Sequence, residues 1–111
     1  MRTIAFVTQK GGSGKSTLAS SLAVTAHEAG ERVFIIDLDP QKSLVMWSQT
    51  RGEADVPVEA IAPAKLTSVI AALEKSGVTL CIIDTAGAET AATKAAMKAA
   101  DLCIIPSRPN V

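Results

Sequence analysis

"QKGGSGKST", residues 9–17, sets three glycines, two lysines and three hydroxyl residues close together. An apolar run precedes this segment and an amphipathic one follows it, so we expect a loop that joins a strand to a helix. Glycine permits positive φ and lets the backbone approach a ligand closely. Consecutive N–H groups in such a loop surround an anion at the helix N-terminus, where the helix dipole adds attraction. The segment therefore predicts a phosphate-binding loop, with a flexible Gly/Ser turn as the plain alternative.

Individual positions of this loop have distinct expected roles. Lys15 is placed to reach the β- and γ-phosphates of a nucleotide, and the Ser16 hydroxyl to ligate Mg²⁺. A loop of this kind usually opens with glycine six positions before that lysine, where this chain has Gln9, and Lys10 then adds a second cation. The expected nucleotide contacts are Lys10, Gly11, Gly12, Ser13, Gly14, Lys15, Ser16 and Thr17.

Short apolar runs alternate with helical patterns along the whole chain. This alternation predicts an α/β fold, a mostly parallel sheet with helices on both faces in three layers. The expected strands are 3–8, 32–39, 56–62, 79–87 and 102–106, and the expected helices are 15–29, 44–51, 63–76 and 89–100.

Local signals refine three of these elements. In the first helix we expect one apolar face made by Leu18, Leu22, Ala26 and Ala29. Ser43 is expected to cap the short second helix. Pro57 lacks an N–H, which favours an edge position for the strand that contains it.

Aspartates end two of the expected strands. Asp37 and Asp39 close the segment "DLDPQ" and are two residues apart, so both should project at the carboxyl edge of the sheet, where open α/β folds bind ligands. Two like charges there need a cation or water between them, or else either residue serves as a helix-cap or turn aspartate. Asp84 ends the apolar strand "CIID" and is expected to hold Mg²⁺ through water, with residues 85–87 forming the second switch; a strand-end turn is the alternative.

Together these motifs carry a family resemblance. "KGGSGKST" resembles the deviant Walker A motif of the ParA/MinD partition ATPases, "DLDPQ" is similar to their switch I, and "CIIDTAG" is similar to their Walker B strand. The resemblance implies that Lys10 reaches the phosphates of a partner protomer in a nucleotide-bound dimer. It implies that Asp39 orients the attacking water and the Mg²⁺ shell. Lys10, Lys15 and Asp39 are then the expected catalytic residues, and Ser16, Asp39 and Asp84 the expected metal site.

The resemblance implies an ATP-binding, Mg²⁺-dependent ATPase of the P-loop class that acts in plasmid or chromosome partitioning through an ATP-dependent homodimer. For a full-length protein it also implies non-specific DNA binding, association with the nucleoid and a centromere-binding, ParB-like partner. The same motifs would serve a MinD-like ATPase, or one that positions other cargo or assists conjugation. A non-catalytic nucleotide-binding fragment is the alternative from a different class.

Bulk properties limit the other options. The 111 residues are 48% hydrophobic and 20% charged, as in a globular domain, and eleven basic residues balance eleven acidic ones. No overall field draws the chain to nucleic acid, and no run is long enough to span a membrane, so we expect a cytoplasmic protein with no membrane partner. The chain stops at "SRPNV" directly after a strand, so residues 1–111 are expected to be the N-terminal part of a single P-loop nucleotide-binding domain.

Five further side chains receive plain expectations. Cys81 and Cys103 are expected to be buried free thiols. Trp47 should pack on the second helix, His27 should lie on a helix surface, and Arg108 is expected to be a solvated loop residue that could approach a nucleotide or partner.

Overall fold

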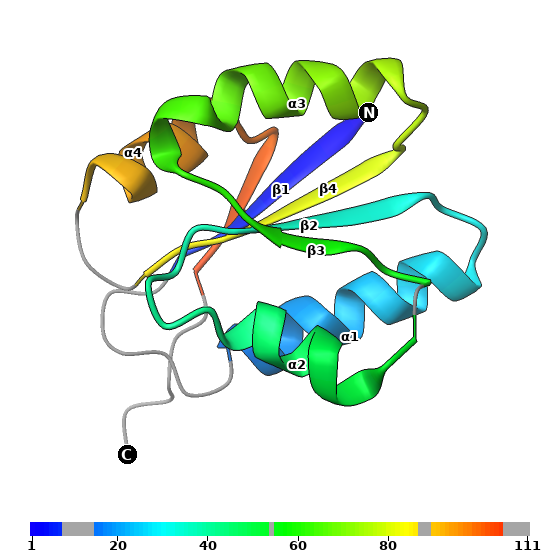
Figure 1. Cartoon of the computed structure of the whole chain (residues 1–111). Coiled ribbons are helices and arrows are strands. Elements are labelled where there is room, and N and C mark those ends of the chain that lie inside the picture. Colours follow the sequence, from blue (N-terminus) through cyan, green and yellow to red (C-terminus); the bar gives the residue numbers. More distant parts are fainter. Residues whose placement is uncertain (8–14, 54, 87–89, 106–111) are drawn as a thin grey trace.

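The computed structural model describes residues 1–7, 15–53, 55–86 and 90–105, without the side chain of Lys15. Within these residues the chain forms a five-stranded, wholly parallel sheet with the strand order β3-β2-β4-β1-β5 (Figure 1). In chain order the elements are β1 (Arg2–Phe6), α1 (Lys15–Glu28), β2 (Val33–Asp37), α2 (Ser43–Arg51), β3 (Val58–Ala60), η1 (Pro63–Lys65), α3 (Leu66–Lys75), β4 (Leu80–Asp84), α4 (Ala91–Ala99) and β5 (Leu102–Ile104).

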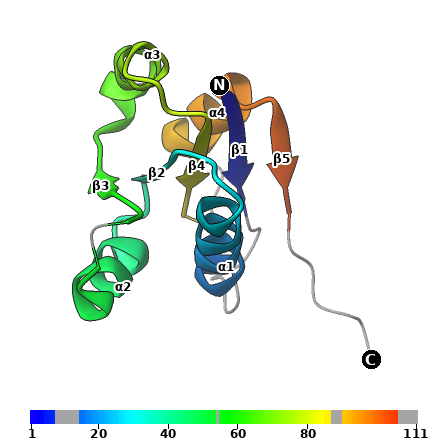
Figure 2. The same cartoon turned by 90° about the vertical axis from the view of Figure 1, so that its right-hand side faces the viewer.

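Two hydrophobic cores lie on opposite faces of the sheet. Figure 2 shows α1 and α2 against one face and α3 and α4 against the other. All five residues of the central strand β4 are buried, because both of its faces are covered. Ile82 belongs to the core under α1 and α2, whereas Ile83 belongs to the core under α3 and α4. The three-layer α/β/α architecture expected from the sequence is confirmed.

The buried face of α1 differs from the expected one. Ala19 and Ala23 are fully buried, whereas Leu18 is 45% exposed and Ala29 is also exposed. Leu22 and Ala26 do pack against the core, so the expected face is turned partly outward. The residues that α1 buries fully are thus small alanines rather than Leu18.

Both edges of the sheet agree with the sequence pattern. β3 begins at Val58, directly after Pro57, and is an edge strand as expected. The carbonyl of Pro57 accepts a hydrogen bond of 2.9 Å from the amide of Ile35, so the proline contributes the one ladder group it has. At the other edge lies β5, the last strand of the chain, where Leu102 is 55% exposed.

Helix α4 begins with a side-chain cap. Thr90 has an extended backbone, and its hydroxyl oxygen accepts a hydrogen bond of 3.2 Å from the amide of Thr93.

Among the described residues, no helix is long and apolar enough to cross a bilayer.

Replacing Thr90 by alanine is expected to destabilise the fold by about 1 kcal/mol, because the Thr93 amide then loses its acceptor. Thermal unfolding should show a lower midpoint, by roughly 4–8 °C for a domain of this size. Thr90→Ser keeps the hydroxyl and should stay close to the parent. If Thr90→Ala is as stable as the parent, the hydroxyl does not cap the helix.

Candidate functional site

The carboxyl ends of three strands meet at one edge of the sheet. Phe6 on β1 is in register with Asp84 on β4, and Asp84 is in register with Asp37 on β2. Helices α1 and α2 begin at this same edge (Figure 1). Open α/β sheets bind their ligands here, so this edge is the candidate site.

In the sequence the predicted phosphate loop follows β1 and precedes α1, and these two elements meet this edge. Helix α1 begins at Lys15, as the sequence indicated, so a helix N-terminus follows the loop. The half-buried Ser16 and the exposed Thr17 belong to its first turn. The remaining predicted contacts, Lys10, Gly11, Gly12, Ser13 and Gly14, lie outside the described residues, as does the Lys15 side chain.

Hydrogen bonds join the three strand ends to one another. The amide of Leu38 donates to the carbonyl of Asp84 at 2.8 Å. The Thr85 amide and hydroxyl both donate to the carbonyl of Phe6, at 3.2 and 3.1 Å. Asp84 and Thr85 are both fully buried. The carboxyl ends of β1, β4 and β2 are therefore held together, and Thr85, expected in the second switch, is hydrogen-bonded to β1.

Asp37 caps helix α2, one of the two roles left open by the sequence. Its Oδ1 accepts from the amide of Asp39 at 3.0 Å, and its Oδ2 accepts from the amide of Val45 at 3.2 Å. The residue is only 1% exposed, and this burial raises the pKa of its carboxyl, while the bonds from Asp39 and Val45 act in the opposite direction. The expectation for Ser43 was wrong: α2 begins at Ser43, and Lys42 before it makes no side-chain cap.

Asp39 lies in the turn between β2 and α2 and is half-buried. Its Oδ1 accepts from the amide of Gln41 at 2.9 Å, and its carbonyl accepts from the amide of Lys42 at 2.9 Å. The turn is therefore closed around Asp39 from both its side chain and its backbone. The two aspartates consequently differ: Asp37 is buried under α2, and Asp39 stands further out along the edge.

The residues present at this edge suit Mg²⁺. Asp39, Asp84 and Ser16 offer carboxylate and hydroxyl oxygens, the donors that this ion prefers. No group of three or more His, Cys, Asp or Glu side chains that could hold a metal ion occurs in the described part of the chain. Mg²⁺ usually keeps several waters and is bound by one or two carboxylates together with substrate phosphates, and Asp39 and Asp84 are two such carboxylates at this edge.

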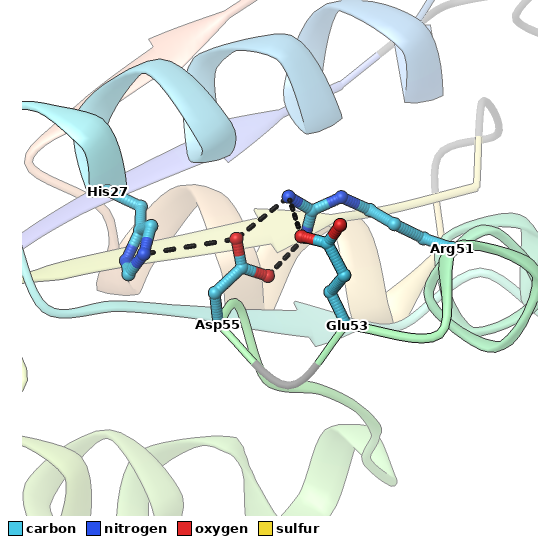
Figure 3. Close-up of polar contacts among 4 residues, drawn as sticks. All are labelled: His27, Arg51, Glu53 and Asp55. Atoms are coloured by element: carbon cyan, nitrogen blue, oxygen red, sulfur yellow. Dashed lines mark hydrogen bonds and ion pairs between the residues drawn. The ribbon is translucent and has the colours of Figure 1, made fainter.

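The sequence reading missed an ion-pair cluster at the far end of α2 (Figure 3). Arg51 contacts Asp55 through both guanidinium nitrogens, one of them at 2.7 Å, and contacts Glu53 at 3.2 Å. His27 on α1 lies 3.8 Å from the Asp55 carboxylate. The hydrogen bond from Arg51 lowers the pKa of Asp55. The spacing of Arg51 and Asp55 was visible, but Gly52 ends the helix between them, so no helical face predicted the pair.

This cluster lies away from the candidate site. His27 and Asp55 line a cleft of about 520 Å³ together with residues at the start of β2 and the end of α3. Those are the amino end of a strand and the carboxyl end of a helix, whereas helix N-termini and the carboxyl ends of strands favour phosphate binding. The cleft is therefore no candidate for the nucleotide.

The remaining single-residue expectations have clear outcomes. Cys81 is buried, and burial raises the pKa of its thiol to about 12, so it stays neutral and inert. Cys103 is also free but only half-buried, less than expected. Trp47 packs against the core, and the guanidinium carbon of Arg51 lies over the Trp47 ring, 5.4 Å from the ring centre. His27 is a helix-surface residue as expected, and Arg108 lies outside the described residues.

The fold and this edge define a P-loop nucleotide-binding domain. The family model described as "CobQ/CobB/MinD/ParA nucleotide binding domain" matches residues 4–102. The chain therefore belongs to this family, and the resemblance to ParA/MinD proteins is confirmed.

Relatives support the same assignment. The chain is 31% identical to "Protein ParA" of Rhizobium radiobacter over 112 aligned residues, which cover 99% of this chain and 50% of that protein. It is 36% identical to "Maintenance of carboxysome distribution protein A" of Gloeobacter kilaueensis, over 97% of this chain and 50% of that protein. The chain thus spans about half the length of these curated relatives.

Solved structures agree on the fold. MinD in the MinC:MinD cell division complex of Aquifex aeolicus matches with a TM-score of 0.67 at 16% identity, covering 95% of this chain and 55% of that one. FtsY of Mycoplasma mycoides matches with a TM-score of 0.67 at 23% identity, covering 88% of this chain and 38% of that one.

Proposed function

We propose that this chain is the nucleotide-binding part of a Mg²⁺-dependent ATPase of the ParA type, which acts in partitioning through an ATP-dependent dimer. The observation that carries the proposal is the meeting of Asp84 and the β2 turn at the strand edge where α1 begins, at Lys15 within "KGGSGKST". The relative named "Protein ParA", aligned over nearly the whole chain, supports the choice of the ParA type.

Each part of the edge has a role in this proposal. The loop amides and the N-terminus of α1 hold the phosphates of ATP, and Lys15 offsets their negative charge. Asp39, at the outer side of the edge, orients the water that attacks the γ-phosphate. Asp84, held rigidly between β1 and β2, supports the metal shell together with Ser16. Mg²⁺, when bound, neutralises charge that develops on the phosphate oxygens.

Lys10 carries the dimer part of the proposal. Lys10 and Lys15 belong to the same short segment of one chain. Their two positive charges repel each other unless further negative charge is near. The triphosphate of a second protomer supplies that charge. The dimer then provides the surface for non-specific DNA and for a centromere-binding partner that triggers hydrolysis.

The decisive experiment replaces Lys10 by alanine. The variant is expected to bind ATP within a few-fold of the parent, roughly the effect of a single exposed charge, but to lose ATP-dependent dimerisation. Light scattering with Mg²⁺ and a slowly hydrolysed ATP analogue measures the mass, and calorimetric titration measures binding. Lys94→Ala, on the exposed face of α4, is the matched control and should dimerise normally.

Two outcomes contradict the proposal. If the parent binds no ATP in the presence of Mg²⁺, the nucleotide function fails. If Lys10→Ala dimerises as well as the parent, Lys10 acts only within its own chain.

A second candidate function uses the same site. The relative named for carboxysome distribution is 36% identical to this chain, so the dimer could position a cargo other than DNA. Binding of the ATP-loaded dimer to DNA at low and high salt separates the two: a complex that weakens steeply with salt favours partitioning of DNA.

A further inference from the structure

We propose that Asp37 is a positioning residue of the candidate site: it binds the start of α2 and the backbone of Asp39 at once, and so places Asp39 at the edge of the sheet. This inference rests on the proposed function for its effect on hydrolysis, but the contacts that carry it are independent of any ligand.

The start of α2 has an unusual cap. The first amides of a helix have no acceptor within the helix, and a nearby Ser, Thr, Asp or Asn usually supplies one. Here Lys42 precedes the helix with φ 55° and ψ 42° and makes no side-chain cap, and the first turn of α2 has no acidic residue. The acceptor is instead Asp37, eight residues before Val45, at the end of β2.

The same carboxylate also holds the turn that contains Asp39. One Asp37 oxygen accepts the Asp39 amide, and the other accepts the Val45 amide. Asp39 in turn accepts the amides of Gln41 and Lys42. Asp37 is thus the first link of a chain of hydrogen bonds that runs through Asp39 to the start of α2.

Burial makes this anchor firm. Asp37 is 1% exposed, and its strand is bonded to β4 through the Leu38 amide and the Asp84 carbonyl. A buried carboxylate that binds backbone amides cannot swing outward without leaving those amides unsatisfied. Asp37 therefore acts through Asp39 and the turn, rather than as a ligand of the metal.

The test is Asp37→Asn, which keeps the shape but has one acceptor oxygen where the carboxylate has two. Without nucleotide, hydrogen exchange at the amides of Asp39, Val45, Gln41 and Lys42 should speed up by about tenfold or more, because one charge-assisted bond is lost and the turn loosens. In the proposed ATPase, kcat should fall by roughly tenfold with KM within about twofold of the parent, and the Mg²⁺ concentration for half-maximal rate should not change.

Asp55→Asn is the matched control, because Asp55 contacts the other end of α2 through Arg51. It should leave exchange at the four turn amides and the turnover unchanged. If Asp37→Asn does not fold, the parent alone remains informative: the Val45 amide, in a first helical turn, should exchange more slowly than the Ser43 amide. Equal exchange of these two amides in the parent overturns the cap.

Each remaining outcome is decisive. Unchanged exchange at Val45 in Asp37→Asn overturns the cap, and faster exchange at Val45 with unchanged Gln41 and Lys42 overturns the positioning of Asp39. A shift in the Mg²⁺ dependence overturns the claim that Asp37 is no metal ligand. If the parent does not hydrolyse ATP, the proposed function fails, and the exchange rates alone still decide the role of Asp37.

Discussion

Alanine in place of Lys15 is expected to abolish measurable nucleotide binding. The lysine starts α1 at the edge where the phosphates are proposed to lie. We propose that its ammonium offsets the charge of the β- and γ-phosphates. Loss of such a charge-assisted contact costs on the order of 2–3 kcal/mol, which lowers affinity by tens-fold to more than a hundredfold. Calorimetric titration with ATP and Mg²⁺ measures the change.

Lys75→Ala is a suitable control, since Lys75 lies in the last turn of α3, on the opposite face of the sheet from α1. Its affinity for ATP should match that of the parent. An unchanged affinity in Lys15→Ala would remove the phosphate-loop assignment.

Loss of the Asp39 carboxylate is expected to stop hydrolysis while ATP still binds. Asp39 is half-buried in the turn after β2 and is not part of the predicted phosphate loop. Single-turnover rates of Asp39→Ala should fall by roughly 10²-fold or more, as for loss of a group that orients or activates water. Rapid-quench measurements of ATP cleavage and a parallel binding titration separate the two effects.

The variant Asp39→Asn separates the effect of the Asp39 charge from its role in stabilising the turn. Its amide oxygen can still accept the Gln41 amide, which the structure places 2.9 Å from Oδ1, so the turn should persist. We expect this variant to be nearly as slow as Asp39→Ala. If Asp39→Asn hydrolyses ATP at the parental rate, Asp39 serves only to stabilise the turn. If Asp39→Ala also hydrolyses ATP at the parental rate while Asp84→Ala is inactive, another residue orients the water.

Sequence pattern alone predicted the order and type of the elements well. The alternation of apolar runs and helical periodicity is a local property, and every expected strand and helix has a counterpart in the structure. Strand ends were less accurate: the strand expected at 32–39 ends at Asp37, because the backbone turns there to bring Asp39 and Val45 onto its carboxylate. The pattern could not show that turn, since the hydrogen bonds that make it join residues up to eight positions apart.

Packing decided which helical faces are buried. In α1, the expected face includes Leu18, yet Ala19 and Ala23 are fully buried and Leu18 is 45% exposed. In α3, the large residues Leu66, Val69, Ile70 and Leu73 do face the core, as their spacing indicated. Periodicity therefore predicts a face only where the large apolar residues are also the ones that fit the gap to the sheet.

The candidate site divides along the same line. The glycines, lysines and aspartates that suit a phosphate and Mg²⁺ are recognisable from residue type and spacing, because each role depends on local chemistry. The different roles of Asp37 and Asp39 cannot be recognised in this way, since both residues have the same side chain and both lie at the end of one expected strand. Only the folded sheet separates them: it buries Asp37 beneath the start of α2, where backbone amides take up its carboxylate, and leaves Asp39 nearer to solvent at the edge.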